Sequence, residues 1–284
     1  MCSPSILQLA IASLTAQELK ELKELKELKQ FAERRERQKR ADAPPTRARR
    51  TLSASQVVDL THPLTHEFPI IPIPGLTFPF RQRPIATLGK NGVFANKWEL
   101  IEHNGTHIDA PSHFAASQAN LEGVRADNLV VPLAVVDIRA KAAKNQDAAL
   151  TPDDLLAWEK RHGRLPQNAA VVMWSGWDRR AGNARDFLNS DASGTLHFPG
   201  FPPETCEFLL RERQISGIGV DTISFDLGVD KTYSAHRALF KGGKWGIECI
   251  ANLAAVPPAG ATIFVGALKV PGASGSPIRL IAVF

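Results

Sequence analysis

Short apolar runs, separated by turns and by a few helical segments, constrain the fold of this chain most strongly. Three of these runs are rich in β-branched residues and indicate buried strands, at positions 129–140, 169–177 and 215–224. Helix-forming residues fill the two intervals between them, at 151–163 and 202–214. For the first helix, Thr151 offers an N-cap and Pro152 a favourable first residue. Strands that alternate with helices predict an α/β body with a mixed sheet.

The remaining segments of the body add strands and one extended loop. Strands are expected in QVVDLTHPL at 56–64 and in PIRLIAVF at 277–284. Residues 97–111 indicate a strand that runs into a glycine-containing turn, and residues 249–270 indicate a short helix and a strand. The segment FPIIPIPGLTFPF at 68–80 has too many prolines for a central strand. We expect it to be an extended loop that could wall a pocket.

The net charge of +5 invites a nucleic-acid function, but its distribution argues against one. Residues 1–50 hold twelve Lys or Arg and seven Asp or Glu, whereas the rest of the chain holds twenty-two of each. Residues 15–41 are strong helix formers without Gly or Pro, and the prolines and arginines of 41–51 are typical of a linker. We therefore predict a basic, helical N-terminal extension at 1–50 and one domain at 51–284.

Neither a membrane span nor a disulfide framework is expected. No apolar run approaches the roughly eighteen residues that cross a bilayer. The three cysteines, Cys2, Cys206 and Cys249, are few and far apart, which favours a reducing compartment. The N-terminal residues lack the basic segment of a secretory signal, so we expect a cytoplasmic protein.

Histidines gather in one stretch, IEHNGTHIDAPSHF at 101–114. Eleven positions hold three of the eight histidines and an aspartate, namely His103, His107, Asp109 and His113. The Asn-Gly pair opposes a continuous helix, and His107 and Asp109 share one face of an extended backbone. Pro111 then ends regular structure, so His113 can fold back to the same point. Imidazoles with one carboxylate suit Zn²⁺, Mn²⁺ or Fe²⁺, so we expect a metal or catalytic site.

The same stretch carries a resemblance to a known family. HNGTHIDAPSH matches the pattern His-x-Gly-Thr-His-x-Asp-x-Pro-x-His of the metal-dependent cyclase family. HRALFKGGKWGIECI at 236–250 resembles the downstream family segment that holds a His and a Gly-Ile-Glu, and DLTHPL, WSGWD and GVDTISFD resemble further segments in the right order. The resemblance spans about residues 55–284 and does not cover the extension. The family includes bacterial-type kynurenine formamidases, also called arylformamidases, and isatin hydrolases.

Carried over residue by residue, this resemblance implies a metal centre. The implied ligands are His103, His107, Asp109, His236 and Glu248. Asp109 would bridge two ions, of which one or both are bound per subunit, with Zn²⁺ or Mn²⁺ as the metal. His113 would be the catalytic acid/base. Thr106 would either support the turn or hydrogen-bond a metal ligand. The implied fold is an α/β/β arrangement of swivelling β/β/α character, and the implied assembly is a homodimer or homotetramer.

The residues that would contact a substrate are less well defined by the sequence. Tryptophans and phenylalanines could stack on an aromatic substrate, and polar residues at the end of a strand could line the pocket. The candidates are Trp174, Trp177, Asp221, Ser224, Phe68 and Phe80.

Three functions remain open from the sequence. The leading hypothesis is hydrolysis of a C–N amide-type bond by metal-activated water, with a small aromatic amide such as N-formylkynurenine as substrate. A second is opening of isatin or of another lactam or lactone by the same kind of site. A third, of another class, is a non-catalytic metal-binding scaffold. We expect no nucleic-acid or membrane partner for any of them.

Overall fold

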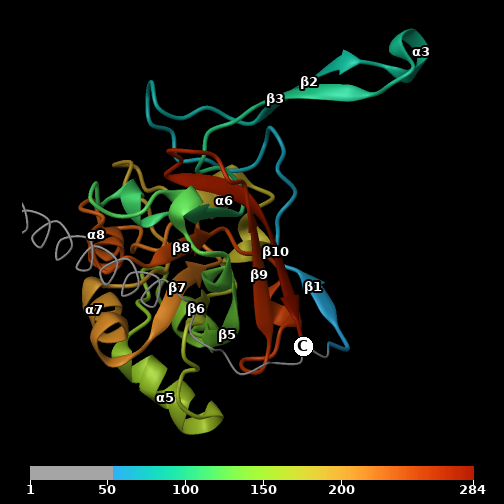
Figure 1. The fold of residues 1–284 in the computed structure, drawn as a ribbon. Coiled ribbons are helices and arrows are strands. Elements are labelled where there is room, and N and C mark those ends of the chain that lie inside the picture. Colours follow the sequence, from blue (N-terminus) through green and yellow to red (C-terminus); the bar gives the residue numbers. More distant parts are fainter. Residues whose placement is uncertain (1–53) are drawn as a thin grey trace, which may run out of the picture. The chain divides into compact units, whose positions relative to one another are not determined.

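Seven strands form a mixed sheet that closes on itself, in the order β10-β4-β8-β7-β6-β5-β9, with β9 paired back to β10. This arrangement comes from a computed structural model, which describes residues 54–284 (Figure 1). The predicted N-terminal extension lies outside the described residues. The closed strands are β4 (His107–Asp109), β5 (Val130–Asp137), β6 (Ala169–Trp174), β7 (Ile215–Val220), β8 (Trp245–Glu248), β9 (Thr262–Ala267) and β10 (Gly275–Val283).

The strands β5, β6, β7 and β8 are parallel neighbours. Their β-branched residues suit strands that are buried on both faces. Helices α5 (Pro152–His162), α7 (Pro203–Glu212) and α8 (Ser234–Lys241) pack on one face of these strands. Two shorter helices are α4 (Arg139–Ala142) and α6 (Ala184–Leu188). Strands β4, β9 and β10 close the sheet through antiparallel pairs, and β1 (Val57–Asp59) pairs with β10 at its edge.

Alternate residues of β5 belong to two different cores, because successive side chains of a strand point to opposite faces. Leu133 and Val135 pack inside the closed sheet with residues such as Ile108 of β4. Val136 packs on the other face, against α5, α7 and α8. The core on this outer face is built around large buried side chains, including Trp158 and Phe240.

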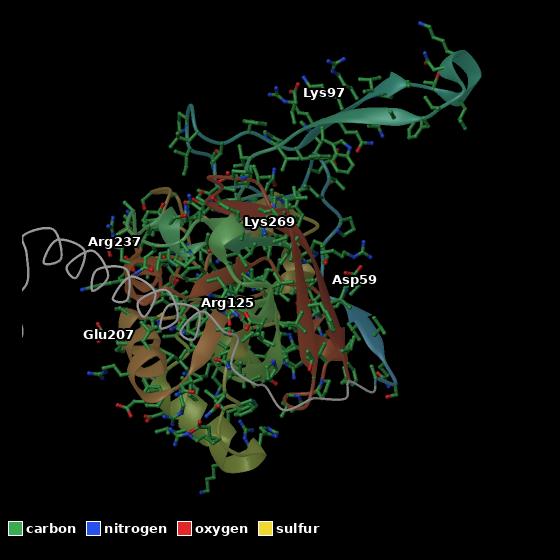
Figure 2. All side chains as sticks on the ribbon, in the orientation of Figure 1. Asp59, Lys97, Arg125, Glu207, Arg237 and Lys269 are labelled. Atoms are coloured by element: carbon green, nitrogen blue, oxygen red, sulfur yellow. The ribbon has the colours of Figure 1, made fainter. Side chains whose placement is uncertain are left out.

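One hairpin stands apart from this body. Strands β2 (Arg81–Ala86) and β3 (Ala95–Glu99) form a separate two-stranded sheet that is joined by α3 (Leu88–Asn91). We call residues 81–99 the arm. Figure 1 shows the arm projecting away from the closed sheet, and Figure 2 shows Lys97 on it. Its apolar side chains are largely exposed, including Phe94 at 63% and Trp98 at 62%.

The predicted α/β body with a mixed sheet is confirmed, while the swivelling β/β/α character stays a prediction. Helix α5 begins after Thr151 as expected, and the Asp154 carboxylate accepts from the Thr151 N–H in a capping box. The loop at 68–80 contains no strand, as its prolines predicted. Several elements were not expected from the sequence, namely β2, α3, α4, α6, α8 and β8, and neither was closure of the sheet. Among the described residues, no helix is long and apolar enough to span a membrane.

Candidate metal centre

Strand β4 presents two of the predicted ligands on one face. His107 and Asp109 are two residues apart, and Ile108 between them points into the core. Strand β8 pairs with β4 in a register that places Glu248 directly opposite His107. The His107 Nε2 atom lies 3.2 Å from Asp109 Oδ1 and 3.3 Å from Glu248 Oε2. Two strands that are far apart in sequence thus bring a histidine and two carboxylates together.

Helix α8 delivers His236 to the same point. Its Nε2 atom lies 3.4 Å from Asp109 Oδ2 and 3.4 Å from Glu248 Oε1. The ring is stacked on Phe225 at a centroid distance of 3.6 Å. Its Nδ1 atom is hydrogen-bonded to the buried Asp226 carboxylate. If Nδ1–H donates to that carboxylate, the Nε2 lone pair is left facing the cluster, which is the arrangement of a metal-binding histidine.

The turn after β3 brings in His103, and a 3-10 helix (Pro111–His113) brings in His113. His103 Nδ1 lies 2.6 Å from Asp109 Oδ1, and its Nε2 lies 3.1 Å from Ser274 Oγ. The His103 and His113 rings are stacked at a centroid distance of 3.9 Å. Gly105 allows this turn with a positive φ of 68°. The structure therefore brings together all five predicted ligands and His113.

Thr106 forms two hydrogen bonds that fix the turn. Its hydroxyl donates to the Cys249 carbonyl at 2.6 Å and accepts from the His62 N–H at 2.9 Å. It therefore joins the histidine-rich stretch to the chain after Glu248 and to the segment after β1.

The donor atoms fit a divalent cation. The His107 Nδ1–H donates to the Gly105 carbonyl at 2.9 Å, while the buried Nε2 atom has no hydrogen-bond partner among the described residues. Two groups have ligand atoms within 4.8 Å of one another, and both contain Asp109: one adds His103 and His113, the other His107 and Glu248. Imidazole and carboxylate donors of this kind suit Zn²⁺ or Mn²⁺. His113 therefore stands close enough to be a ligand as well as an acid/base.

Charge in the cluster is balanced through the histidines. Burial alone would lower the pKa of His107, but Asp109 and Glu248 raise it to about 10. Burial would also raise the pKa of Asp109, yet His103 and His107 hold it well below its usual range. A divalent cation would neutralise the two carboxylates in place of these protons. By contrast, burial lowers the pKa of His113 to about 4, so its imidazole is neutral at pH 7.

The residues of the cluster line a cavity of about 660 Å³. The proline-rich loop supplies an aliphatic wall, as its composition predicted, and Leu100 and Ile101 extend it. An aromatic wall is formed by Phe114 and Tyr233, whose ring centroids are 5.2 Å apart. Among the described residues that line this cavity, none is Lys or Arg.

Of the six predicted substrate contacts, only Ser224 lines the cavity. The two tryptophans pack elsewhere, so their assignment to the pocket is corrected. The Arg139 guanidinium covers the Trp174 ring at 3.5 Å, and the buried Trp177 indole donates to the Phe187 carbonyl. Trp174 is partly buried and packs against the core inside the closed sheet, whereas Trp177 belongs to a separate core with Phe187.

Asp221, Phe68 and Phe80 are also placed away from the cavity lining. The Asp221 carboxylate is buried and accepts hydrogen bonds from Ser175 and from the Trp177 N–H, so it joins the ends of β7 and β6. Phe68 packs in a small core with Trp177, and Phe80 packs edge-on against Trp98 at the base of the arm. These three side chains therefore serve hydrogen bonding and packing within the fold.

Four residues at the site were missed by sequence reasoning: Asp226, Ser274, Phe114 and Tyr233. Asp226 ends the segment GVDTISFD, but nothing in its local pattern connects it to a histidine ten positions later. Phe114 directly follows His113, so its position in the motif was the available signal. Ser274 comes from a loop that no motif marks.

Comparison with known proteins places these features in context. The model of the Cyclase family matches residues 58–227. The chain is 34% identical to the isatin hydrolase of Roseibium aggregatum over 241 residues, which cover 80% of this chain and 91% of that protein. It is 27% identical to the kynurenine formamidase of Bacillus cytotoxicus over 235 residues, which cover 81% and 98%. A solved isatin hydrolase bound to the product analogue thioisatinate has a TM-score of 0.76 at 33% identity, covering 81% and 92%.

Proposed function

The chain belongs to the Cyclase family of metal-dependent hydrolases, and on that premise we propose that it opens the C–N bond of a small aromatic cyclic amide such as isatin. One observation carries this proposal: five predicted ligands converge beside His113 in a cavity with apolar walls. The apolar walls suit a flat ring, and the polar cluster suits its carbonyl group.

Hydrolysis of N-formylkynurenine is the second candidate, supported by the likeness to a kynurenine formamidase. That substrate carries an amino-acid carboxylate, which would need a cationic partner on being bound. Because no Lys or Arg is among the described residues that line the cavity, the neutral isatin fits better. The lack of a cation among these lining residues supports isatin over the formamide that the sequence suggested.

The roles of the chain's own residues follow from their positions. His103, His107, Asp109, His236 and Glu248 would hold Zn²⁺ or Mn²⁺, as one or two ions. When bound, such an ion supplies Lewis-acid chemistry, because it lowers the pKa of water and polarises a carbonyl. The His113 imidazole is neutral at pH 7. It can accept a proton from the attacking water at a ring nitrogen and then donate that proton to the leaving nitrogen of the amide. The walls of the cavity orient the substrate ring.

The substrate assignment is tested by steady-state hydrolysis of isatin and of N-formylkynurenine on the same metal-loaded protein. We expect kcat/KM for isatin to exceed that for N-formylkynurenine by at least about tenfold, because one unpaired carboxylate costs 1 to 3 kcal/mol. A higher kcat/KM for the formamide would establish the second candidate instead. Ring opening is followed at the absorbance of isatin, with boiled protein as the blank.

We further propose that the arm packs against a second copy of this chain, which gives the homodimer or homotetramer that the resemblance implied. A two-stranded hairpin is only marginally stable in water by itself, and this one pairs with no other described strand. It also exposes Ile85, Leu88, Val93, Phe94 and Trp98. A patch of this kind marks an interaction surface, and a two-fold pair would cover both copies of it by one contact.

Along the chain, the arm connects the two segments that form the aliphatic wall of the cavity. A second copy bound at the arm would therefore lie beside the site. Light scattering coupled to size exclusion measures the mass of the wild type and of a Phe94→Ser, Trp98→Ser double variant. We expect an oligomer for the wild type and a monomer for the variant. Leu156→Ser, which changes an exposed residue of α5, is the control and should leave the mass unchanged. A monomeric wild type would refute this assembly.

We also propose that the protein is cytoplasmic, as the sequence led us to expect. Cys206 and Cys249 are buried free thiols, and burial raises the pKa of both. Neither is poised as a nucleophile, which agrees with the role of packing residues.

A further inference from the structure

Tyr233, the single tyrosine of the chain, has a backbone conformation that bulky residues rarely adopt. Its φ of 55° and ψ of 47° lie in the left-handed region, immediately before helix α8, which carries His236. Glycine and asparagine tolerate this region, whereas other residues are strained in it. A tyrosine kept at such a position calls for a physical reason.

The other residues with this conformation point to the cavity. Five non-glycine residues of the described chain have a positive φ, and three of them are asparagines, for which it is ordinary: Asn168, Asn189 and Asn252. The remaining two are Tyr233 and Cys249, and both line the cavity beside the metal centre. Strain in less tolerant residues is therefore concentrated at the site, as is common where geometry serves function.

The start of helix α8 does not explain Tyr233. The side chain of Tyr233 makes no capping hydrogen bond. The Asp230 carboxylate serves the first turn instead, because it accepts from the Ser234 N–H and from the Thr232 N–H. A glycine or an asparagine at position 233 would let the chain turn in the same way with less strain.

What Tyr233 contributes is its ring. The ring lies 5.2 Å from Phe114 and meets His236 edge-on at 6.0 Å, and it is 37% exposed. Its hydroxyl makes no hydrogen bond within the described residues. The ring therefore lines the cavity beside Phe114 and is partly open to solvent.

We propose that Tyr233 is a specificity-determining residue, whose ring stacks on the flat ring of the substrate and whose strained backbone is retained for that contact. This inference rests on the proposed function, because it assumes an aromatic amide in the cavity. Aromatic stacking of this kind has a preferred offset or edge-on geometry, so the position of the ring matters as well as its area.

The test separates the ring from the backbone with three variants. Tyr233→Phe keeps the ring, Tyr233→Ala removes it but keeps the strain, and Tyr233→Gly removes both. We expect KM for isatin to rise about fivefold in the Ala and Gly variants with kcat within about twofold, and to stay within about twofold in the Phe variant. We also expect the Gly variant to melt at least about 2 °C above the Ala variant. Asn168→Gly is the backbone control and should change neither KM nor Tm appreciably.

An unchanged KM in the Ala and Gly variants would overturn the proposal, as would a fall in kcat alone, which would place the effect at His236. If the wild-type protein hydrolyses neither isatin nor N-formylkynurenine, the proposed function fails, and binding of thioisatinate decides on Tyr233 separately. Calorimetry on the metal-loaded protein should then show affinity for thioisatinate at least about fivefold lower in the Gly variant. Equal affinity for thioisatinate in the wild type and in the Tyr233→Gly variant would refute the role of the ring.

Discussion

At the scale of single residues, the site depends on partners that hold each ligand in one orientation. His236 shows this most clearly, because its Nδ1 atom is bound to Asp226 while its Nε2 atom faces Asp109 and Glu248. Replacing Asp226 by Asn would leave the fold in place but would no longer fix the ring and its basicity. We expect Asp226→Asn to lower the affinity for Zn²⁺ about 10-fold to 100-fold in a competition titration with a chromophoric chelator.

Asp186→Asn is the matched control for this variant, since Asp186 is exposed in the short helix α6. Its metal affinity should equal that of the wild type. Wild-type affinity in Asp226→Asn as well would show that Asp226 does not orient the ligand.

Asp221 provides a prediction about pH that is independent of the metal. Burial raises the pKa of its carboxyl from the ordinary 3.8 to about 6, although hydrogen bonds from Ser175 and Trp177 oppose that rise. The folded protein therefore binds more protons than the unfolded chain between about pH 4 and pH 6. Its free energy of unfolding should fall as pH rises through this window, by about 3 kcal/mol from this group.

Urea unfolding of the wild type and of Asp221→Asn at pH 4.5 and pH 7 measures this effect. We expect the variant to be less stable at both pH values because an amide cannot accept all the hydrogen bonds that the carboxylate accepts. The free energy of unfolding of the variant should therefore lack the decrease from pH 4.5 to pH 7 that Asp221 causes in the wild type. The same pH dependence in both proteins would assign the effect to other groups.

At the scale of elements, the site is made by the pairing of β4 with β8 and β10. Gly275 of β10 lies opposite Asp109, and a Cβ atom there would lie 2.6 Å from His103 Cε1 and 2.8 Å from the Ile108 carbonyl oxygen. We therefore expect Gly275→Ala to displace His103, to lower metal affinity, and to reduce the free energy of unfolding by about 1 to 3 kcal/mol.

The control for Gly275→Ala is Gly182→Ala, because a Cβ at Gly182 would meet nothing within 4 Å. We expect its free energy of unfolding to change by less than about 0.5 kcal/mol. Urea unfolding and metal titration measure both variants. Equal stability and equal metal affinity in the two would show that β10 can accommodate a Cβ atom at position 275 without displacing His103.

The same scale explains how much of the molecule was predictable. The residues from His103 to His113 lie within eleven positions, so their type and spacing indicated the metal site locally. His236 and Glu248 came only through the family resemblance, because the register of β8 with β4 is a long-range fact. Likewise, composition alone does not tell whether Trp174 and Trp177 face a pocket or a core. Closure of the sheet depends on the pairing of β9 with both β10 and β5, and no local sequence pattern specifies these two partners.

At the scale of the whole molecule, the metal should be part of the stability of the protein. Asp109 and Glu248 are both buried, and their mutual repulsion is relieved by protons on the histidines or by a cation. A ligand at one hundred times its Kd stabilises the folded state by about 2.7 kcal/mol. We expect a chelator to lower Tm by about 5 to 10 °C at neutral pH, and Zn²⁺ or Mn²⁺ to restore it. A Tm unaffected by chelator in protein shown to have lost its metal would exclude this coupling.

The central claim is that this cluster holds the metal on which hydrolysis depends. The most direct measurement is metal content by mass spectrometry and isatin hydrolysis on the same samples, before chelation, after chelation, and after reloading with Zn²⁺ or Mn²⁺. The account predicts that content and turnover fall and return together, and that Glu248→Gln lowers both. Full turnover by metal-free protein would contradict the account. Bound metal without turnover of isatin or N-formylkynurenine would contradict the proposed activity and would favour a scaffold or another substrate.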